Sequence, residues 1–419
     1  MNMKEKKRFC DRPWLSPKSE KSTYFLYILF AFCFEPKLFA KFPALNALFA
    51  AGIAACFGIM GLLYLSSRKR PSVLLVAVGV YRASFMVQTF FAENGDFLMW
   101  GYMSVVLLTM CMAVDYYIKD KGSQLIEVVL HLLIYLLVGN LIISLLYPEG
   151  AVENLYFIGI RTRLTDVIIP MLVLAMVLDW MNRRALSFRT SLCFILALLT
   201  VLQHEVVTAI LGLVILFFCY AIFYTMRREW MDSSLNVGTL AGIALTLDAL
   251  IVHAQITLRM EWIFVNVLNK TATLTDRLLI WERAVDIIAN KPLMGHGMAE
   301  NGNFVPGPAS LNADILWQAH NQWLQMLYDG GILTVLAFLA VIMVCFKGLW
   351  CESPRRPRMA FLAGLFAFFV MMSVEIFTYT PYFFVLLFIG NHANKLSRSD
   401  EPRLGWLETI ALKNERYPQ

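Results

Sequence analysis

Two arginines and one histidine in this sequence have side chains suited to handle a charged leaving group and a proton. Arg277 and Arg283 lie in a long polar interruption of an apolar chain, which also contains the turn Pro292-Leu-Met-Gly-His-Gly297 and the pair His320-Asn321. A guanidinium is permanently charged and matches phosphate oxygens with two hydrogen bonds. Histidine is the side chain best suited to exchange a proton at neutral pH. Together these residues predict a phosphate or diphosphate site with an acid–base group beside it.

The composition indicates a membrane protein. Of 419 residues, 59% are hydrophobic and only 16% are charged, and the mean hydropathy is +0.62. Charged residues approach a quarter of a soluble domain. The net charge of +6 comes from short Lys and Arg clusters between apolar runs. This pattern indicates membrane orientation and argues against nucleic-acid binding.

Neither a disulfide framework nor a metal site is predicted. The eight cysteines lie in apolar runs or in segments assigned to the cytoplasmic side, and the polar stretch 257–322 contains none. Its acidic residues Asp276, Asp286 and Asp314 are scattered and form no Asp-x-Asp pair that could clamp a diphosphate through a divalent ion. No cofactor is expected.

Hydropathy predicts about twelve transmembrane helices, because a bilayer core of about 30 Å needs about 20 apolar residues. The segments are 23–40, 44–66, 72–92, 97–118, 124–147, 165–182, 188–203, 206–225, 236–256, 330–350, 359–377 and 380–394. Gln203-His204-Glu205 marks a turn between two of them. Lys and Arg accumulate on alternate loops if both termini are cytoplasmic.

These segments define an all-α integral membrane protein with one large extracytoplasmic helical loop between helices 9 and 10. The predicted parts are a cytoplasmic tail, helices 1–9, the extracytoplasmic loop, helices 10–12 and a second cytoplasmic tail, over residues 1–22, 23–256, 257–329, 330–394 and 395–419.

The loop is expected to contain two helices. The first covers about 276–289, capped by Thr275-Asp276, and is too short to cross. It should lie along the membrane surface, with Trp281 as an interfacial anchor and Arg277 pointing the same way. Gly295 and Gly297 permit a reversal after it. The second helix begins near Asn312, carries Trp317, His320, Asn321 and Leu324, and leads through Gly330-Gly331 into the tenth crossing.

Four arginines, Arg161, Arg163, Arg277 and Arg283, fall on the side expected to carry fewer positive charges. Ion pairs with Glu282, Asp286 or Glu153 would explain them structurally. A membrane-tethered diphosphate is the functional alternative. His320 likewise has a structural alternative, as a hydrogen-bonded residue, and His204 with Glu205 could line the same cavity from an outer turn.

Several motifs appear in a fixed order over about 60 residues. Arg277-Leu-Leu-Ile-Trp281, Asn290-Lys-Pro-Leu-Met-Gly-His-Gly297, His320-Asn-Gln-Trp-Leu324 and Gly330-Gly-Ile332 follow one another. This series resembles the O-antigen ligase and surface polysaccharide polymerase family. The number of spans and the late external loop also agree with that family.

The resemblance implies a metal-independent, inverting glycosyl transfer outside the bacterial plasma membrane, from an undecaprenyl-diphosphate-linked glycan to a glycan or lipid acceptor. By this resemblance Arg277 binds the diphosphate and His320 acts on the acceptor hydroxyl, while Asn321 belongs to the His320 motif. Ligases of the family carry a further Arg after a Ser near the outer end of a middle helix. This chain has Gln203-His204-Glu205-Val-Val-Thr208 there, so Arg161 and Arg163 are the candidate replacements, and polymerase and ligase both stay open.

A secondary transporter or lipid-linked glycan flippase is the rival interpretation. Arg82, Glu127, His131, His253 and Glu375 lie in or near spans, where ionisable groups are costly and usually functional. No matching pair of interrupted helices occurs in the two halves of the chain, which disfavours a transporter.

Overall fold

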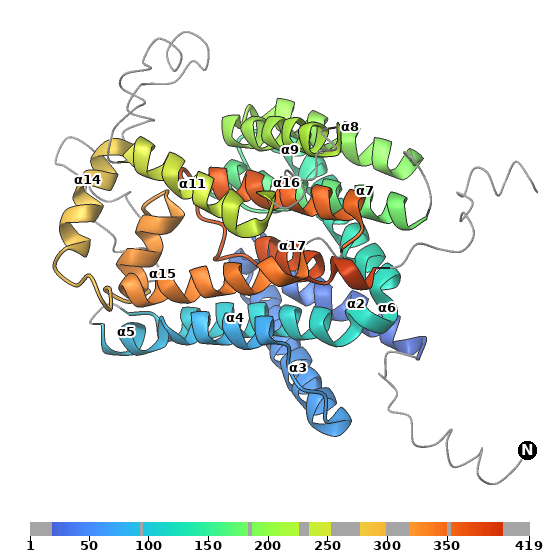
Figure 1. Ribbon diagram of the computed structural model, residues 1–419, viewed down its shortest axis with the longest axis horizontal. Helices are drawn as coiled ribbons and strands as arrows, with labels where there is room; N and C mark the ends of the chain where they lie inside the picture. Colours follow the sequence, from blue (N-terminus) through green and yellow to red (C-terminus); the bar gives the residue numbers. More distant parts are fainter. Residues whose placement is uncertain are drawn as a thin grey trace, which may run out of the picture.

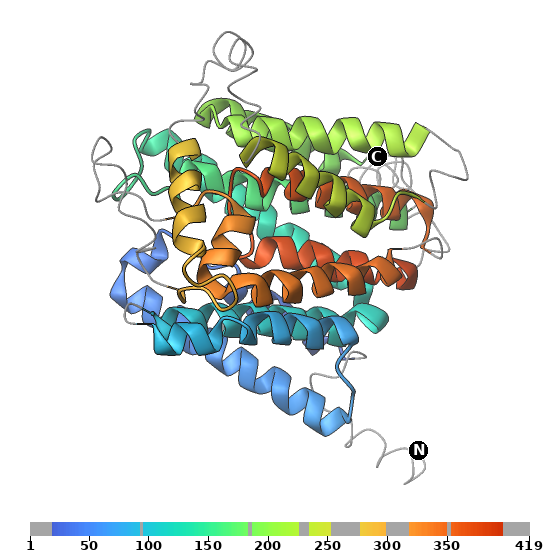
Figure 2. The same cartoon turned by 60° about the vertical axis from the view of Figure 1, so that its left-hand side comes forward.

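Helices form all of the regular secondary structure in the described part of the chain. The computed structural model describes residues 19–92, 95–182, 187–225, 234–252, 277–298, 318–349 and 353–396. Within these ranges the only β pairing is an isolated bridge between Val152 and Leu155. Long helices lie side by side in a bundle, and α14 lies across one of its ends (Figures 1 and 2). The predicted all-α class is therefore confirmed.

The predicted apolar segments reappear in order as helices. The helices are α2 (Lys21–Cys33), α3 (Pro43–Ser67), α4 (Val73–Ala83), α5 (Met86–Phe91), α6 (Phe97–Leu146), α7 (Leu164–Met181), α8 (Phe188–His204), α9 (Val207–Thr225), α11 (Val237–Val252), α14 (Arg277–Ile288), α15 (Gln322–Gly348), α16 (Arg355–Met371) and α17 (Pro381–Asn391). The turn predicted at Gln203-His204-Glu205 is confirmed, because α8 ends at His204 and Glu205 has a left-handed φ of 50°.

Helix α6 contains two of the predicted segments, 97–118 and 124–147. Its 50 residues would extend about 75 Å if straight, more than twice the thickness of a bilayer core. Lys121 breaks the helix with φ −133° and ψ 31°. The break divides α6 where the sequence predicted a turn between two crossings.

Five helical stretches are long and apolar enough to cross a membrane. They are Pro43–Ser67, Val73–Phe91, Phe97–Leu146, Arg161–Met181 and Gln322–Cys345. The chain is therefore a multi-pass membrane protein. The count of twelve crossings stays a prediction, since other apolar helices such as α2 and α17 are shorter than about 20 residues.

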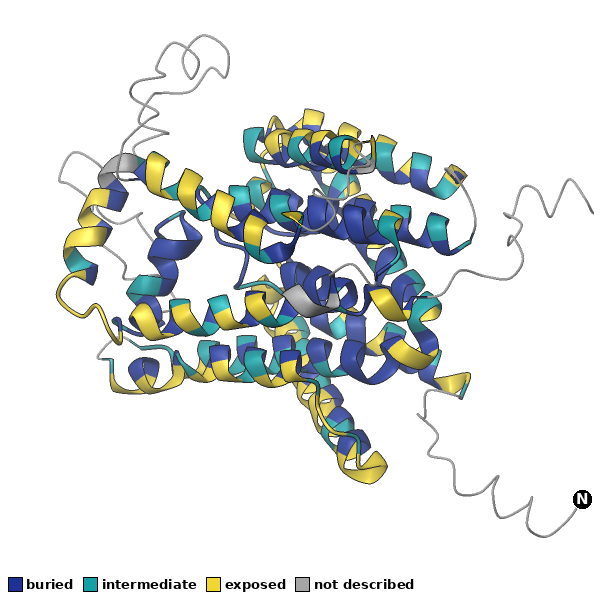
Figure 3. Ribbon diagram, viewed as in Figure 1, coloured by how far each residue is buried: buried dark blue, intermediate teal, exposed yellow. Residues whose placement is uncertain are grey.

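Helices α16 and α17 form the centre of the bundle (Figure 3). α16 packs against α7, α9 and α11, and α17 packs against α6, α7 and α15. The predicted spans 359–377 and 380–394 were too long, because α16 ends at Met371 and α17 covers only Pro381–Asn391. Polar residues of the intervening 372–380 turn bond to other segments instead of continuing the helix, and Pro381 begins α17 with a preset φ.

The two ends of the bundle carry different segments. Leu38 donates its backbone N–H to Phe157, so the loops after α2 and α6 share one end. At the other end Lys121 donates to Thr23 at 2.9 Å, and Gly122 lies against Leu396. The described residues nearest the two termini therefore share the lysine-rich end. The predicted orientation, with both termini on the cytoplasmic side, requires the two termini to lie at the same end of the bundle. Which side of the membrane this end faces stays a prediction.

The glycine turn after α14 packs into a break in α15. Gly331 interrupts that helix with φ 66° and ψ −166°, close to where the tenth crossing was predicted to begin. Ile332 donates to the Pro292 carbonyl at 2.9 Å, and the N–H of Gly297 donates to the Asp329 carbonyl at 2.9 Å. A Cβ on Gly331 would lie 2.3 Å from the Leu293 carbonyl carbon. The motif thus fixes α14 to α15 by close backbone contact.

Gly331→Ala should destabilise the protein, because the backbone conformation is one that only glycine adopts at little cost, about 1–3 kcal/mol for other residues, and the added methyl overlaps the 293 carbonyl. We expect the midpoint of thermal unfolding in detergent to fall by several degrees. Gly101→Ala in α6, where a Cβ would meet nothing within 4 Å, is the matched control and should leave the midpoint unchanged or higher. Equal midpoints for both variants would contradict this role for Gly331.

Candidate functional site

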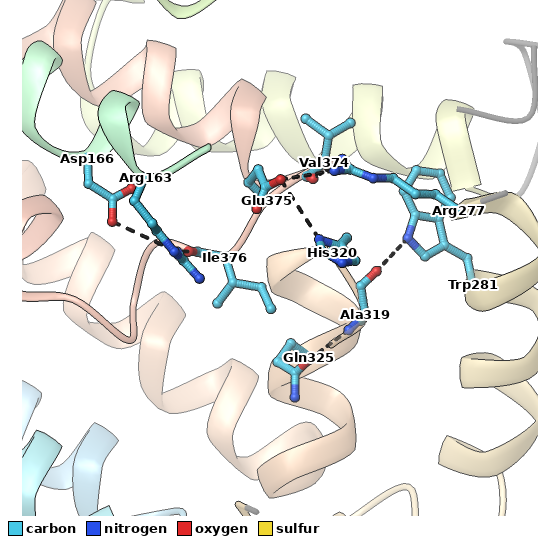
Figure 4. Close-up of polar contacts among 10 residues, drawn as sticks. All are labelled: Arg163, Asp166, Arg277, Trp281, Ala319, His320, Gln325, Val374, Glu375 and Ile376. Atoms are coloured by element: carbon cyan, nitrogen blue, oxygen red, sulfur yellow. Dashed lines mark hydrogen bonds and ion pairs between the residues drawn. The ribbon is translucent and has the colours of Figure 1, made fainter. Parts of the chain in front are cut away.

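Arg277 and His320 meet at one buried carboxylate, that of Glu375 (Figure 4). The Nη2 of Arg277 lies 2.9 Å from Glu375 Oε1, and its Nη1 donates to the Val374 carbonyl. The Nδ1 of His320 lies 3.8 Å from the same Oε1. That separation is too long for a hydrogen bond, and Nδ1 is buried without a hydrogen-bond partner among the described residues.

Arg277 is the first residue of α14, and Trp281 holds that helix in place. The indole Nε1 donates to the Ala319 carbonyl at 2.8 Å, directly before His320 (Figure 4). Trp281 is 1% exposed and packs with Ile280, Ala284, Ile288, Ala319 and Leu324. The prediction of Trp281 as a membrane-surface anchor was therefore wrong, because its apolar partner is the protein itself. The predicted helix 276–289 is found as α14, and its predicted cap Thr275-Asp276 lies outside the described residues.

His320 stands in the bend that precedes α15. Its φ of 48° is left-handed, a conformation in which a residue other than glycine costs about 1–3 kcal/mol. Ala319 on one side donates its N–H to Gln325 Oε1 at 2.9 Å. Hydrogen bonds to both neighbours of His320, namely Ala319 and Asn321, hold this strained backbone conformation in place.

Asn321 on the other side of His320 caps α15. Its Oδ1 accepts from the N–H groups of Trp323 and Leu324, and its Nδ2 donates to Asp248 at 2.7 Å and to the Ser373 carbonyl at 3.1 Å. We predicted a second helix that carries His320 and Asn321. That prediction was wrong for both residues, because the cap begins the helix at Gln322. Asn312 and Trp317 lie outside the described residues.

Gln322 holds the 372–380 turn from inside. Its Oε1 accepts from the N–H groups of Phe377 and Thr378 at 2.9 and 3.0 Å. Its own N–H donates to the Met372 carbonyl at 2.7 Å. The side chain of Gln322 is fully buried. Glu375 is therefore presented by a turn whose backbone groups are bonded to the first turn of α15.

Burial alone would raise the pKa of the Glu375 carboxyl, which is 3% exposed. The nearby His320, Arg277 and Arg163 reverse this effect and lower the pKa to about 2. These neighbours therefore favour the charged form of the Glu375 carboxyl. The site has a carboxylate at its centre, with two guanidinium groups and an imidazole around it.

Arg163 reaches the same turn from the opposite side (Figure 4). It belongs to the short helix η2 (Arg161–Arg163) before α7. Its Nη1 donates to the Ile376 carbonyl at 2.5 Å and lies 3.8 Å from Asp166 Oδ2. Arg277 and Arg163 thus bind the carbonyls on either side of Glu375.

Other predicted site residues lie outside this group. Arg161 is half exposed and donates to the Tyr156 hydroxyl at 3.2 Å. The His204 ring packs edge-on against Tyr156, with centroids 4.6 Å apart, so Arg161 and His204 share a neighbouring cluster. Arg283 is exposed on α14. Gly295 and Gly297 lie at the break in α15, where they position α14.

The ionisable residues that suggested a transporter have local partners. Arg82 is buried and its Nε donates to Ser104 at 3.0 Å. His131 Nδ1 lies 2.7 Å from the Tyr27 hydroxyl, and Glu127 pairs with Arg189 at 3.4 Å. His253 lies outside the described residues. Only Glu375 of this set joins the site described above.

Glu375 is the site residue whose role the sequence did not reveal. Its one signal was a carboxylate inside an apolar run. The structural alternative for the arginines named Glu282, Asp286 and Glu153 as partners and did not include Glu375; of these three, Glu153 pairs with Lys41. In the described part of the chain no three His, Cys, Asp or Glu side chains gather as a metal site.

Residues 192–339 match the family model described as O-antigen ligase. The match extends from α8 into α15 and includes Arg277, Trp281, the glycine turn and His320, so it confirms the resemblance that these motifs indicate. Arg163 and Glu375 lie outside the matched residues and are connected to the site by the structure alone. No curated protein matches the chain.

Asn321→Ala should loosen the bend that holds His320. It removes the cap of α15 and both donors of the amide, and losing a cap typically costs about 1 kcal/mol. We expect a lower midpoint of thermal unfolding and faster modification of His320 by diethyl pyrocarbonate, read by mass spectrometry. Asn290→Ala, at an exposed amide with only a 3.3 Å contact to the Asp286 carbonyl, is the control. Unchanged reactivity at His320 would show that Asn321 does not order the bend.

Proposed function

From this family match and the site's geometry, we propose that the protein is a glycosyltransferase of surface polysaccharide assembly. It transfers a glycan from an undecaprenyl-diphosphate donor to a hydroxyl of a glycan or lipid acceptor, at the outer face of the bacterial plasma membrane. The observation that carries the proposal is that Arg277 and His320, from separate segments, converge on the buried Glu375 at one end of the bundle.

Arg277 and Arg163 are proposed to bind the diphosphate. The carboxylate that Arg277 now holds at 2.9 Å is a chemical stand-in for a phosphate oxygen, because both accept charge-assisted hydrogen bonds from a guanidinium. Arg163 adds a second guanidinium on the far side of the turn. Arg161, in the neighbouring cluster, and Arg283, exposed on α14, are expected to contribute less.

In the proposed reaction the acceptor oxygen attacks the anomeric carbon that bears the diphosphate. A new glycosidic C–O bond forms while the C–O bond to phosphate breaks, with inversion at that carbon. His320 takes the proton of the attacking hydroxyl through Nε2. The electron pair of the broken bond stays on the diphosphate, where Arg277 and Arg163 stabilise the growing charge without a metal ion.

Glu375 is proposed as a positioning residue for His320. The carboxylate lies near Nδ1 and can orient the ring and stabilise the imidazolium that forms when Nε2 takes a proton. The buried and unpartnered Nδ1 supports this role.

Arg277→Ala and His320→Ala should each lower product formation at least about 100-fold, since each removes a group that acts on charge in the transition state. Arg277→Lys should recover little of the loss, because an ammonium cannot donate two parallel hydrogen bonds. The measurement is glycan length or transfer by purified protein supplied with lipid-diphosphate oligosaccharide and no added metal.

Lys291→Ala, an exposed cation at the end of α14, is the charge-matched control and should keep normal activity. Near-normal product from the Arg277 and His320 variants would refute the site. Gradient-driven movement of the lipid-linked glycan in vesicles, with no new glycosidic bond, would favour the transporter alternative.

Glu375→Gln should lower kcat about tenfold or more while the KM for the lipid-linked donor stays equal or falls. A neutral amide cannot stabilise the imidazolium, and it competes less for Arg277. Glu153→Gln, at an exposed pair with Lys41, controls for loss of an outer carboxylate. A rise in donor KM at unchanged kcat would instead assign Glu375 to donor binding.

A further inference from the structure

A small cavity lies directly beside the 372–380 turn that presents Glu375. Residues from three segments line it, namely the loop after α2, helix α6, and the end of the turn with the start of α17. Their polar members include Glu35, Lys37, Tyr102, Thr378, Thr380 and Tyr382. Thr378 is three residues from Glu375, a distance of at most about 11 Å of extended chain. The cavity is therefore within one or two sugar rings of the proposed reaction centre.

Glu35 gives the cavity an unsatisfied acceptor. Its side chain is 8% exposed, and Oε2 accepts from the Tyr102 hydroxyl at 2.6 Å. Oε1 is buried without a hydrogen-bond partner among the described residues. A buried carboxylate oxygen without a partner destabilises the protein, and a donor from a bound ligand would relieve this.

Lys37 gives the same cavity a hydrogen-bond donor. Lys37 is exposed as a residue, while its ammonium lies near the charges of Glu35, Arg163 and Asp166. Asp166 also has a buried oxygen, Oδ1, with no described partner. Open carboxylate oxygens beside a cation suit hydroxyl groups, because each hydroxyl both donates and accepts.

We infer that this cavity is a subsite for a sugar of the acceptor glycan, which rests on the proposed glycosyl transfer. The hydroxyls on one edge of the sugar donate to Glu35 and accept from Lys37, and the side chains of Tyr102 and Tyr382 line the space around that edge. The turn from Thr378 back to Glu375 then sets how far the next hydroxyl lies from His320.

The size and charge of the cavity argue against the other ligands of the reaction. Its volume is about 40 Å³, enough for a few water molecules or the hydroxyl-bearing edge of one ring, since a water needs about 10–15 Å³. A polyprenyl chain does not fit. A diphosphate would meet the Glu35 carboxylate in this cavity, so it is better placed between Arg277 and Arg163.

The test separates binding from catalysis by using the Arg277→Ala background. The probe is the repeat-unit oligosaccharide released from its lipid, and binding is followed by saturation-transfer difference NMR with a competition titration. We expect Glu35→Gln to weaken binding about tenfold or more and Lys37→Ala to weaken it about threefold or more. Glu153→Gln is the matched control and should bind normally. In the otherwise native protein, the same two variants should raise the KM for acceptor and leave the KM for donor unchanged.

Normal binding and normal acceptor KM in both variants would overturn the subsite while leaving the transferase proposal intact. Lys37 is exposed, so its variant tests the subsite even if Glu35→Gln fails to fold. Loss of glycan transfer in every preparation, with binding still sensitive to Glu35, would support a sugar site and refute the proposed reaction. Equal weakening for donor and acceptor would assign the cavity to the whole lipid-linked glycan and overturn the acceptor assignment.

Discussion

A buried carboxylate with polar partners from three parts of the chain constrains this end of the bundle. Taking an ion out of water costs several kcal/mol even after the protein relaxes, and Glu375 is 3% exposed. Arg277 bonds it directly, while His320 and Arg163 lower its pKa. α14, the bend before α15 and the loop before α7 must therefore lie close together, since withdrawing any of them leaves charge poorly compensated.

The same constraint explains how irregular backbone is accommodated among apolar helices. Non-helical backbone within a membrane protein is tolerated where protein or a water-filled cavity surrounds it and its polar groups are bonded. Here the carbonyls of residues 374 and 376 accept from Arg277 and Arg163, and Gln322 bonds the N–H groups of residues 377 and 378. The arginines thus hold the turn in shape as well as carrying the charge proposed for diphosphate binding. A binding site built this way is preorganised by the contacts that fold it.

The sequence predicted the elements that depend on local pattern. Helix α14, the turn at Glu205 and the start of a helix segment near Gly331 followed from periodicity, glycine and charge. The sequence did not predict a short polar turn inside a segment whose mean hydropathy is high. It also did not predict contacts between residues that are far apart in the chain. The hydropathy of an apolar run concealed the 372–380 turn, although Glu375 lies within it. An amphipathic pattern does not say whether lipid or protein covers Trp281, and no local rule pairs Arg163 with residue 376.

In the proposed reaction the Glu375 carboxylate must give up its hydrogen bond to Arg277 and bond another group. A diphosphate entering between the arginines brings like charge against Glu375, and Arg277 cannot hold both groups with the same two donors. The turn that carries the carboxylate is bonded to Gln322, which disfavours its movement into water. The cheaper path is a short shift toward His320 Nδ1, which is 3.8 Å away and has no described hydrogen-bond partner. Donor binding would then bring the carboxylate to Nδ1 and fix the orientation of the ring, so that Nε2 faces the acceptor hydroxyl only when a leaving group is in place.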